Sequence, residues 1–459
     1  MEKRTFDEKA IRKKILGMIV PITAENILQM TAGVVSMAMV GRISPLAVGA
    51  IGMSNILFRI IWSLFRGIGT GSSVFVAQSF GADDHKRIRS TTVQSFILVF
   101  VSSIILQQIL YWNADTMIRI FNPTTDLLRD GVMYVRIISW SLPFVAPILA
   151  IAGIQQGLGD AKTPMVVIGI LNVVNIIFCY LLIFGNFGFP AMGIRGAAYA
   201  YNLSYIVAAL FAIYALFRRN GTFLKIKGKF ELKFNYKEAL GIVKFGLPTS
   251  FETAFWQVSA IFITRAILTF GETPYAAYQL GLQAEAISFM PAAGFSVAAS
   301  TFIGQSVGAR DPELGKRYFS HLVKLSVIIT SFASIALIFF PRLIMRGFTT
   351  DTEVIAIGAV YLIVMGIVQI PQNLTSLTGG AIRGAGFAKI PMLVAAIGLW
   401  LVRIPLIQLV TFVLEMDIIW VWIVMGIDLV FRFLLTIAIF KKKDIFYNSR
   451  IVTSEEEFV

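Results

Sequence analysis

The chain has 459 residues, of which 57% are hydrophobic and only 14% are charged, and its mean hydropathy is +0.77. A soluble domain is nearer half apolar and a quarter charged, so this composition excludes an ordinary soluble protein and predicts a membrane protein with several spans. The net charge of +14 does not indicate nucleic-acid binding, because the basic residues lie in short segments between apolar runs. Cys179 is the only cysteine, and His85 and His321 are far apart in sequence, so we expect no intrachain disulfide and no metal site.

Apolar runs long enough to cross a bilayer, which takes about 20 residues, recur along the whole chain. We predict an all-α fold whose twelve transmembrane helices cover residues 15–39, 47–79, 91–112, 131–155, 164–185, 195–217, 243–268, 278–305, 318–343, 357–382, 391–414 and 419–440. Prolines such as Pro21, Pro143 and Pro248 lie inside these runs and predict bends. Lys and Arg concentrate at the N-terminus and in alternate loops, which predicts that both termini are cytoplasmic.

An internal repeat divides the chain, and its offset is 227 positions throughout. Pro21-Ile-Thr-Ala-Glu25 returns as Pro248-Thr-Ser-Phe-Glu252, and Tyr134 returns as Tyr361. Further segments that return at this offset include 76–82 as 303–309 and 157–164 as 384–391. One register held over separate segments predicts two copies of one unit. We therefore expect an N-lobe at 1–217, a cytoplasmic inter-lobe loop at 218–242, a C-lobe at 243–440 and a cytoplasmic tail at 441–459.

Each predicted lobe has six spans, so both copies enter the membrane from the same side. The repeats should then be related by an axis along the membrane normal, with a substrate path between the lobes. The sequence has no phosphate-binding loop, because the nearest run, Gly157 to Thr163, lacks the second glycine before its lysine. It also lacks the usual protease and hydrolase motifs, so we expect no enzyme activity and no cofactor. Transport of a solute, coupled to an ion gradient, is the remaining interpretation.

Specific motifs resemble one transporter family over nearly the whole chain. They include Pro21 to Arg42 with its Met-Val-Gly-Arg end, Ala77-Gln-Ser-Phe-Gly-Ala82, Gly246-Leu-Pro248 with Glu252, and Arg383-Gly-Ala-Gly386. Together they resemble the multidrug and toxic compound extrusion (MATE) family. That resemblance implies twelve helices in two lobes and export of organic, often cationic, compounds against sodium ions or protons.

The chain departs from this family at its N-lobe cation site. The resemblance implies an Asp where this chain has Ser36, and an Asp four residues after Asn175 where it has Cys179. Both carboxylates of that site are therefore missing, and a neutral pair of Ser36 and Asn175 would bind sodium weakly.

Intramembrane carboxylates are the strongest candidate site residues, because a charge in hydrocarbon is costly. We predict that Glu25 and Glu252, supported by Glu285, replace the lost site in ion coupling or contact the cationic substrate. Gln29 and Ser36 share a helix face with Glu25, and Gln257 is a further polar candidate for the path. The alternative is that each Glu has a structural role, in which it pairs with a buried arginine or caps a broken stretch of helix backbone. The arginines considered as partners are Arg59, Arg265 and Arg403.

Asp428 has a predicted partner in Arg432 at i+4 spacing, so we expect it to be structural. Gln369 and Asn373, like Gln257, are polar residues inside spans, and they either line the path or form hydrogen bonds between helices. The leading function is a secondary multidrug exporter that acts as a monomer in the bacterial inner membrane, with organic cations and the lipid bilayer as its partners. The alternative is a flippase for lipid-linked oligosaccharides or similar amphiphiles, whose cavity should be lined with several Arg or Lys. Arg59, Arg136 and Arg265 keep that alternative open.

Overall fold

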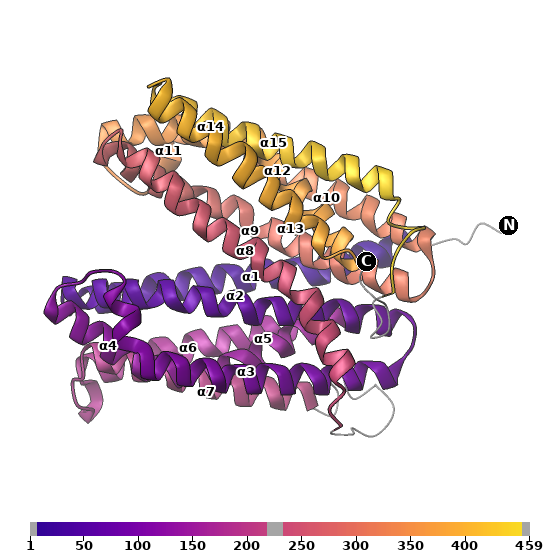
Figure 1. The fold of residues 1–459 in the computed structure, drawn as a ribbon, viewed down its shortest axis with the longest axis horizontal. Coiled ribbons are helices and arrows are strands. Elements are labelled where there is room, and N and C mark those ends of the chain that lie inside the picture. The colour runs from indigo at the N-terminus through magenta and orange to yellow at the C-terminus, as the bar shows by residue number, and fades with distance from the viewer. Residues whose placement is uncertain (1–6, 218–232, 452–459) are drawn as a thin grey trace. The chain divides into compact units, whose positions relative to one another are not determined.

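A computed structural model describes residues 7–217 and 233–451, and all the regular secondary structure in them is helical. The first half contains α1 (Glu8–Gly41), α2 (Pro45–Gly81), α3 (His85–Arg119), α4 (Thr125–Ser139), α5 (Leu142–Gly157), α6 (Lys162–Phe184) and α7 (Ile194–Phe217). The second half contains α8 (Tyr236–Leu268), α9 (Glu272–Gly308), α10 (Pro312–Phe339), α11 (Pro341–Arg346), α12 (Thr352–Gly384), α13 (Lys389–Ala396), α14 (Ile404–Gln408) and α15 (Ile418–Lys443). Figure 1 shows these helices in chain order.

The predicted membrane fold is confirmed, with eleven to twelve spans. Ten helical segments among the described residues are long and apolar enough to cross a bilayer, and α4 with α5 makes an eleventh span bent by 54°. The helix α8, which contains the predicted span 243–268, is 33 residues long but fails the same apolarity test. The predicted span 318–343 is wrong at its end, because α10 stops at Phe339 and Pro341 starts a new short helix. Proline favours the first turn of a helix, where its missing N–H costs nothing.

Local structure repeats at the same offset as the sequence. Asp84 and Asp311, 227 positions apart, are both N-cap residues whose side chains accept a hydrogen bond from the backbone N–H three positions on. Gly153 of α5 lies so close to α2 that a Cβ atom there would be 2.2 Å from the carbonyl oxygen of Gly69. Its counterpart Gly380 of α12 approaches α9 in the same way, with 2.1 Å from a Cβ atom to the carbonyl oxygen of Ser296. The repeat therefore includes the points at which helix backbones pack together.

The described residues form two compact units. The N-terminal unit comprises residues 24–217 and 233–247, and the C-terminal unit comprises residues 7–23 and 248–451. These units differ from the predicted lobes at two helices, because α1 and α8 each change unit partway along their length. The change falls two residues after Pro21 in α1 and at Pro248 in α8. Of the predicted inter-lobe loop 218–242, residues 218–232 lie outside the described residues, as does the end of the predicted tail.

In the N-terminal unit, polar groups hold the beginning of α8. The carboxylate of Glu238 accepts hydrogen bonds from the hydroxyls of Ser90 and Thr91, the latter at 2.7 Å. Gln94 donates to the carbonyl oxygen of Lys233 and accepts from the N–H of Asn235. These bonds join the start of α8 to α3.

Apolar clusters fill both units. In the N-terminal unit, α2, α3, α4, α5 and α7 pack around buried residues such as Phe65, Val135 and Leu142. In the C-terminal unit, α9, α12 and α15 pack around Tyr361 and Trp422, whose rings meet edge to face at 5.1 Å. Lipid tails are as apolar as these side chains, so close van der Waals packing stabilises such clusters within a bilayer.

Candidate functional site

The C-terminal unit contains a cavity of about 620 Å³ that is lined mainly by apolar side chains and by several polar groups. The helices α8, α9, α12, α13 and α15 all contribute to its walls. A largely apolar cavity with a few converging polar groups is the usual form of a small-molecule site. Predicted site residues Glu252, Gln257 and Glu285 all line it.

Glu252 lies in an ion pair. The distance from Arg383 Nη1 of α12 to Glu252 Oε2 of α8 is 3.0 Å, and both side chains are largely buried. Arg383 also donates to the hydroxyl of Ser296 at 3.1 Å. The predicted alternative, in which Glu252 pairs with an arginine, therefore describes the observed geometry, although the partner is none of the arginines expected from sequence.

Glu285 of α9 is held by neutral donors. The Tyr361 hydroxyl donates to Oε2 at 2.5 Å, and Gln372 Nε2 donates to Oε1 at 3.2 Å. Among the described residues no Lys or Arg nitrogen lies within 4.0 Å of this carboxylate. Arg403, which lines the same cavity, acts on Glu285 electrostatically from beyond that distance. Glu285 is therefore a buried carboxylate without an ion-pair partner of its own in the described part of the chain, and a proton or a cationic ligand could neutralise it.

Asp428 of α15 binds two arginines. Its Oδ2 accepts from Arg403 Nε at 2.7 Å and from Arg432 Nη2 at 2.6 Å, while Oδ1 accepts from Arg432 Nε at 3.1 Å. The predicted i+4 pair with Arg432 is thus present, and Arg403 adds a second cation. Both guanidinium carbons lie over the ring of Trp256, at 5.1 Å and 4.6 Å from its centroid. Trp256, Arg403 and Arg432 line the cavity, and Asp428 binds the two arginines from behind that lining.

The N-terminal unit brings together the residues that take the place of the missing family site. The Ser36 hydroxyl donates to Asn175 Oδ1 at 2.8 Å, and Cys179 Sγ lies 3.8 Å from the same oxygen. Asn175 Nδ2 donates to Ser204 at 3.4 Å. The predicted neutral pair therefore exists as part of a small uncharged network.

Glu25 lies apart from that network in the same unit. Its Oε2 atom is buried and makes no hydrogen bond. Arg66 of α2 is the cation that acts on it electrostatically, without an ion pair within 4.0 Å among the described residues. Gln29, one turn further along α1, is half-buried. Glu25 is thus a predicted site carboxylate whose charge has no ion-pair partner within 4.0 Å in the described part of the chain and whose Oε2 atom has no hydrogen-bond donor there.

Sequence reasoning missed several functional candidates. Arg383 and Tyr361 were each present in repeated or family-like segments, but nothing in those segments shows which acid they contact. Arg66 was not among the arginines predicted as partners of a carboxylate. Gln369 donates to Ser288 and Asn373 donates to Thr330, so both residues form hydrogen bonds between helices, which is one of the two alternatives predicted for them.

Comparison with known proteins agrees with this architecture. The family profile described as MatE matches residues 21–181 and 248–409, and both matched segments begin at the repeated prolines. A probable multidrug resistance protein NorM from Thermotoga maritima is 32% identical over 435 residues, which cover 94% of this chain and 92% of that protein. This chain belongs to the MATE family. The MATE protein described here is therefore a multidrug efflux transporter with several membrane spans, and it is not an enzyme.

Further similarities point the same way. The probable multidrug resistance protein YoeA of Bacillus subtilis is 26% identical, over 88% of each chain. A crystal structure of a MATE protein in the straight conformation gives a TM-score of 0.86 at 20% identity, covering 96% of this chain and 98% of that one. An outward-facing MATE family transporter gives 0.85 at 19% identity, covering 97% and 99%. At 19–20% identity, similarity to these solved structures shows that the chain has the same fold as they do.

Proposed function

We propose that this MATE protein exports organic cations in exchange for protons, and that Glu25, Glu252 and Glu285 carry the coupling. The observation that carries the proposal is Glu285, a buried carboxylate that lines the C-terminal cavity and is bound by neutral donors. A charged carboxylate in an apolar environment costs several kcal/mol unless it is neutralised. A proton and an organic cation can each neutralise it, but they cannot do so together.

Competition for the same carboxylates explains exchange. When Glu252 is ionised, Arg383 holds it at 3.0 Å. Among the described residues Glu285 lacks such a partner, so a proton on it removes its attraction for a cation while Tyr361 and Gln372 stay beside it. The cavity therefore passes between a protonated state that rejects a cation and an ionised state that attracts one. Each state must be accessible from a different side of the membrane for net export, which we assign to alternating access of the two lobes.

Sodium coupling has less support in the N-terminal unit. Sodium and other hard cations require several oxygen ligands, preferably with negative charge. The network around Ser36 and Asn175 offers oxygen atoms without charge. Glu25 lacks a hydrogen-bond partner on Oε2, which suits a site for a proton.

The flippase alternative is also less well supported. A pyrophosphate group requires unpaired cations, whereas the arginines that line the cavity are engaged by Glu252 or Asp428. We further propose that the protein works as a monomer in the bacterial inner membrane, with both termini cytoplasmic. This orientation is supported by the concentration of Lys and Arg in alternate loops.

The test is efflux of a fluorescent organic cation from proteoliposomes under a proton gradient alone and under a sodium gradient alone. Wild type is compared with Glu25→Gln, Glu252→Gln and Glu285→Gln. The control is Glu353→Gln, which removes an exposed carboxylate at the start of α12. Loss of a charged contact should weaken substrate binding about ten- to hundred-fold.

We expect a proton gradient to drive efflux in wild type and in the control, and Glu285→Gln to abolish that dependence. Sodium-driven efflux that none of the three glutamine variants changes would refute the proposal. Export of an anionic lipid analogue, with no export of cations, would favour the flippase instead.

A further inference from the structure

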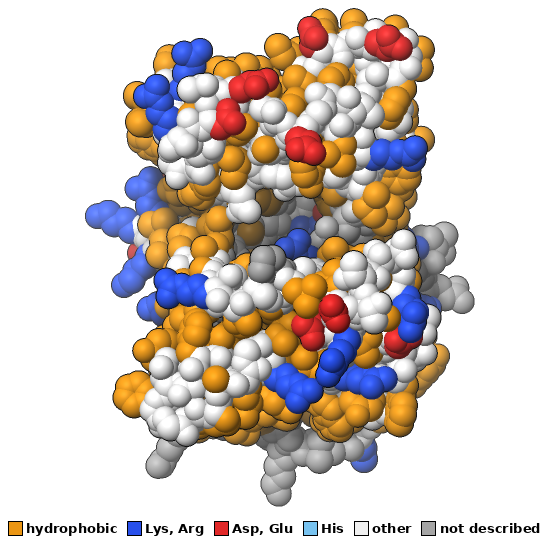
Figure 2. Space-filling view, turned by 90° about the vertical axis from the view of Figure 1, so that its left-hand side faces the viewer, with side chains coloured by type: hydrophobic (Ala, Val, Ile, Leu, Met, Phe, Trp, Pro, Cys, Tyr) orange, Lys and Arg blue, Asp and Glu red, His pale blue; other side chains and the backbone are white. Residues whose placement is uncertain are grey.

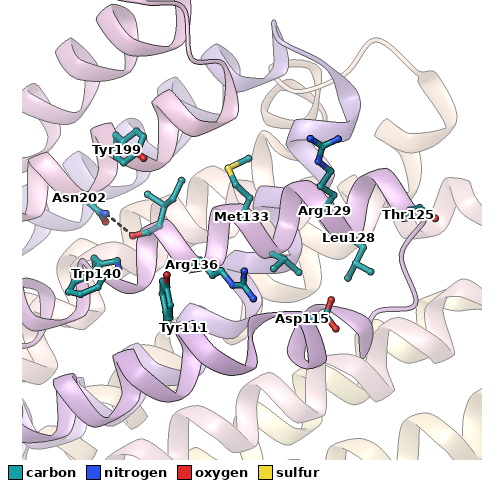
Figure 3. Close-up of a pocket in the computed structure, with 12 residues that line it drawn as sticks. Tyr111, Asp115, Thr125, Leu128, Arg129, Met133, Arg136, Trp140, Tyr199 and Asn202 are labelled. Carbon is teal, nitrogen blue, oxygen red and sulfur yellow. Dashed lines mark hydrogen bonds between the residues drawn. The ribbon is translucent and has the colours of Figure 1, made fainter.

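A second pocket lies in the N-terminal unit between α3, α4 and α7, where none of the predicted site residues is found. Its volume is about 780 Å³. Figure 3 shows Tyr111 and Asp115 on one side, Arg129 and Arg136 on the α4 side, and Tyr199 with Asn202 on α7. We propose that this pocket binds the headgroup of an anionic phospholipid.

Two arginines give the pocket its charge. Arg129 and Arg136 are seven residues apart on α4, so they lie two turns and about 10 Å apart on the same helix face. Both are exposed. Among the described residues neither has a carboxylate within 4.0 Å. A guanidinium group forms paired hydrogen bonds with phosphate oxygens, which makes two unpaired arginines a suitable phosphate site.

The acidic group in the pocket is already occupied. Asp115 accepts from Arg119 Nε at 2.6 Å, so its charge is compensated within α3. Arg136 acts on Asp115 electrostatically but lies beyond ion-pair distance. With Arg119 included, these four charged side chains sum to +2. Figure 2 shows acidic and basic side chains close together on the N-terminal unit at the end where α4 begins.

Aromatic and apolar side chains complete a lipid-like environment. The Arg136 guanidinium carbon lies 5.9 Å from the centroid of the Tyr111 ring. Trp140 and Tyr199, which also line the pocket, are 54% and 44% exposed. Trp and Tyr are typical of the membrane–water interface, where an apolar ring and a polar tip meet different media.

The pocket lies beside the bend between α4 and α5. The helix axis turns by 54° at Trp140 and Ser141. Asn202 Nδ2 of α7 donates to the carbonyl oxygen of Ile137 at 2.7 Å, just before the bend. Helical side chains point toward the N-terminal end of their helix, so Arg136 is directed toward Arg129 rather than toward the bend. Arginines placed in this way between helices can form charge-assisted hydrogen bonds with the phosphate of a lipid headgroup.

The test measures quenching of Trp140 fluorescence by brominated lipids in phosphatidylcholine vesicles that contain the full chain. The signal from Trp140 is isolated by subtracting the Trp140→Phe variant. Brominated phosphatidylglycerol is compared with brominated phosphatidylcholine, and glycerol phosphate is added as a soluble competitor. Variants are Arg129→Gln, Arg136→Gln and the double substitution. The control is Arg346→Gln, which removes an exposed arginine at the end of α11 in the other unit.

We expect phosphatidylglycerol to quench at a lower mole fraction than phosphatidylcholine. Each single substitution should weaken this preference about five-fold and the double substitution about 25-fold, while Arg346→Gln leaves it unchanged. The Arg129→Lys, Arg136→Lys pair should retain most of it, which separates loss of charge from loss of fold. Equal quenching by the two lipids would overturn the proposal, as would an equal effect of Arg346→Gln. Displacement by glycerol phosphate would instead assign a site for soluble anions. The assay uses no ion gradient, so its failure is distinct from failure of the proposed transport.

Discussion

Removal of the Asp428 charge should be among the most destabilising single changes in the C-terminal unit. Asp428 is fully buried and accepts three hydrogen bonds from Arg403 and Arg432. Asp428→Asn preserves the shape of the side chain, but it leaves two buried guanidinium groups without a counter-charge. Breaking a buried charge pair in this way costs about 3–5 kcal/mol. At about 2–4 °C per kcal/mol, the unfolding midpoint should fall by roughly 6–20 °C.

Removal of one of the two arginines should reduce the free energy of unfolding by less than removal of the Asp428 charge. Arg432→Met leaves Asp428 paired one-to-one with Arg403, so the lost hydrogen bonds and partial loss of packing should amount to about 1–2 kcal/mol. Thermal unfolding of purified protein, followed by tryptophan fluorescence, measures both effects. The control is Asp417→Asn, an exposed residue whose side chain makes no capping hydrogen bond. Equal destabilisation by Asp428→Asn and Arg432→Met would refute the reasoning, because the uncompensated charge would then have no effect.

Two further predictions concern a close helix contact and the attachment of α8. Gly153→Ala should destabilise the protein by about 1–3 kcal/mol, because the new Cβ would meet the backbone of α2. Gly169→Ala should be nearly neutral, because the atom nearest to its new Cβ is 3.9 Å away, and equal unfolding midpoints for the two variants would contradict the prediction. Glu238→Gln should weaken the attachment of α8 to α3 by about 1–3 kcal/mol, because an amide cannot accept from Ser90 and Thr91 on both of its polar atoms. Hydrogen exchange at the start of α8 measures that attachment, and unchanged protection there would count against it.

Much of the architecture could be predicted from sequence because it depends on local patterns. Apolar runs define the helices, and the constant offset between Glu25 and Glu252 reveals the repeat before any contact is known. The polar pair of Ser36 and Asn175 was also expected, and the structure places them 2.8 Å apart. These predictions succeed because the spacing and type of the residues involved are enough to indicate helices, a repeat and a polar pair.

The partners of the carboxylates could not be predicted in this way. Glu252 pairs with Arg383, which is 131 positions away, and several other buried arginines were equally suitable in sequence. Glu285 binds Tyr361 and Gln372, which are neutral and therefore gave no electrostatic signal. The end of α10 at Phe339 depended on a single proline two residues later, within a run that remains apolar.

The change of unit within α1 and α8 has a consequence for how the protein is assembled during synthesis. Residues 7–23 are made before residues 24–217, yet they belong to a unit whose remaining described residues begin at 248. They must therefore wait in the membrane without their final neighbours until the second half of the chain has emerged from the ribosome. Conversely, the N-terminal unit is complete only after residue 247 has been made.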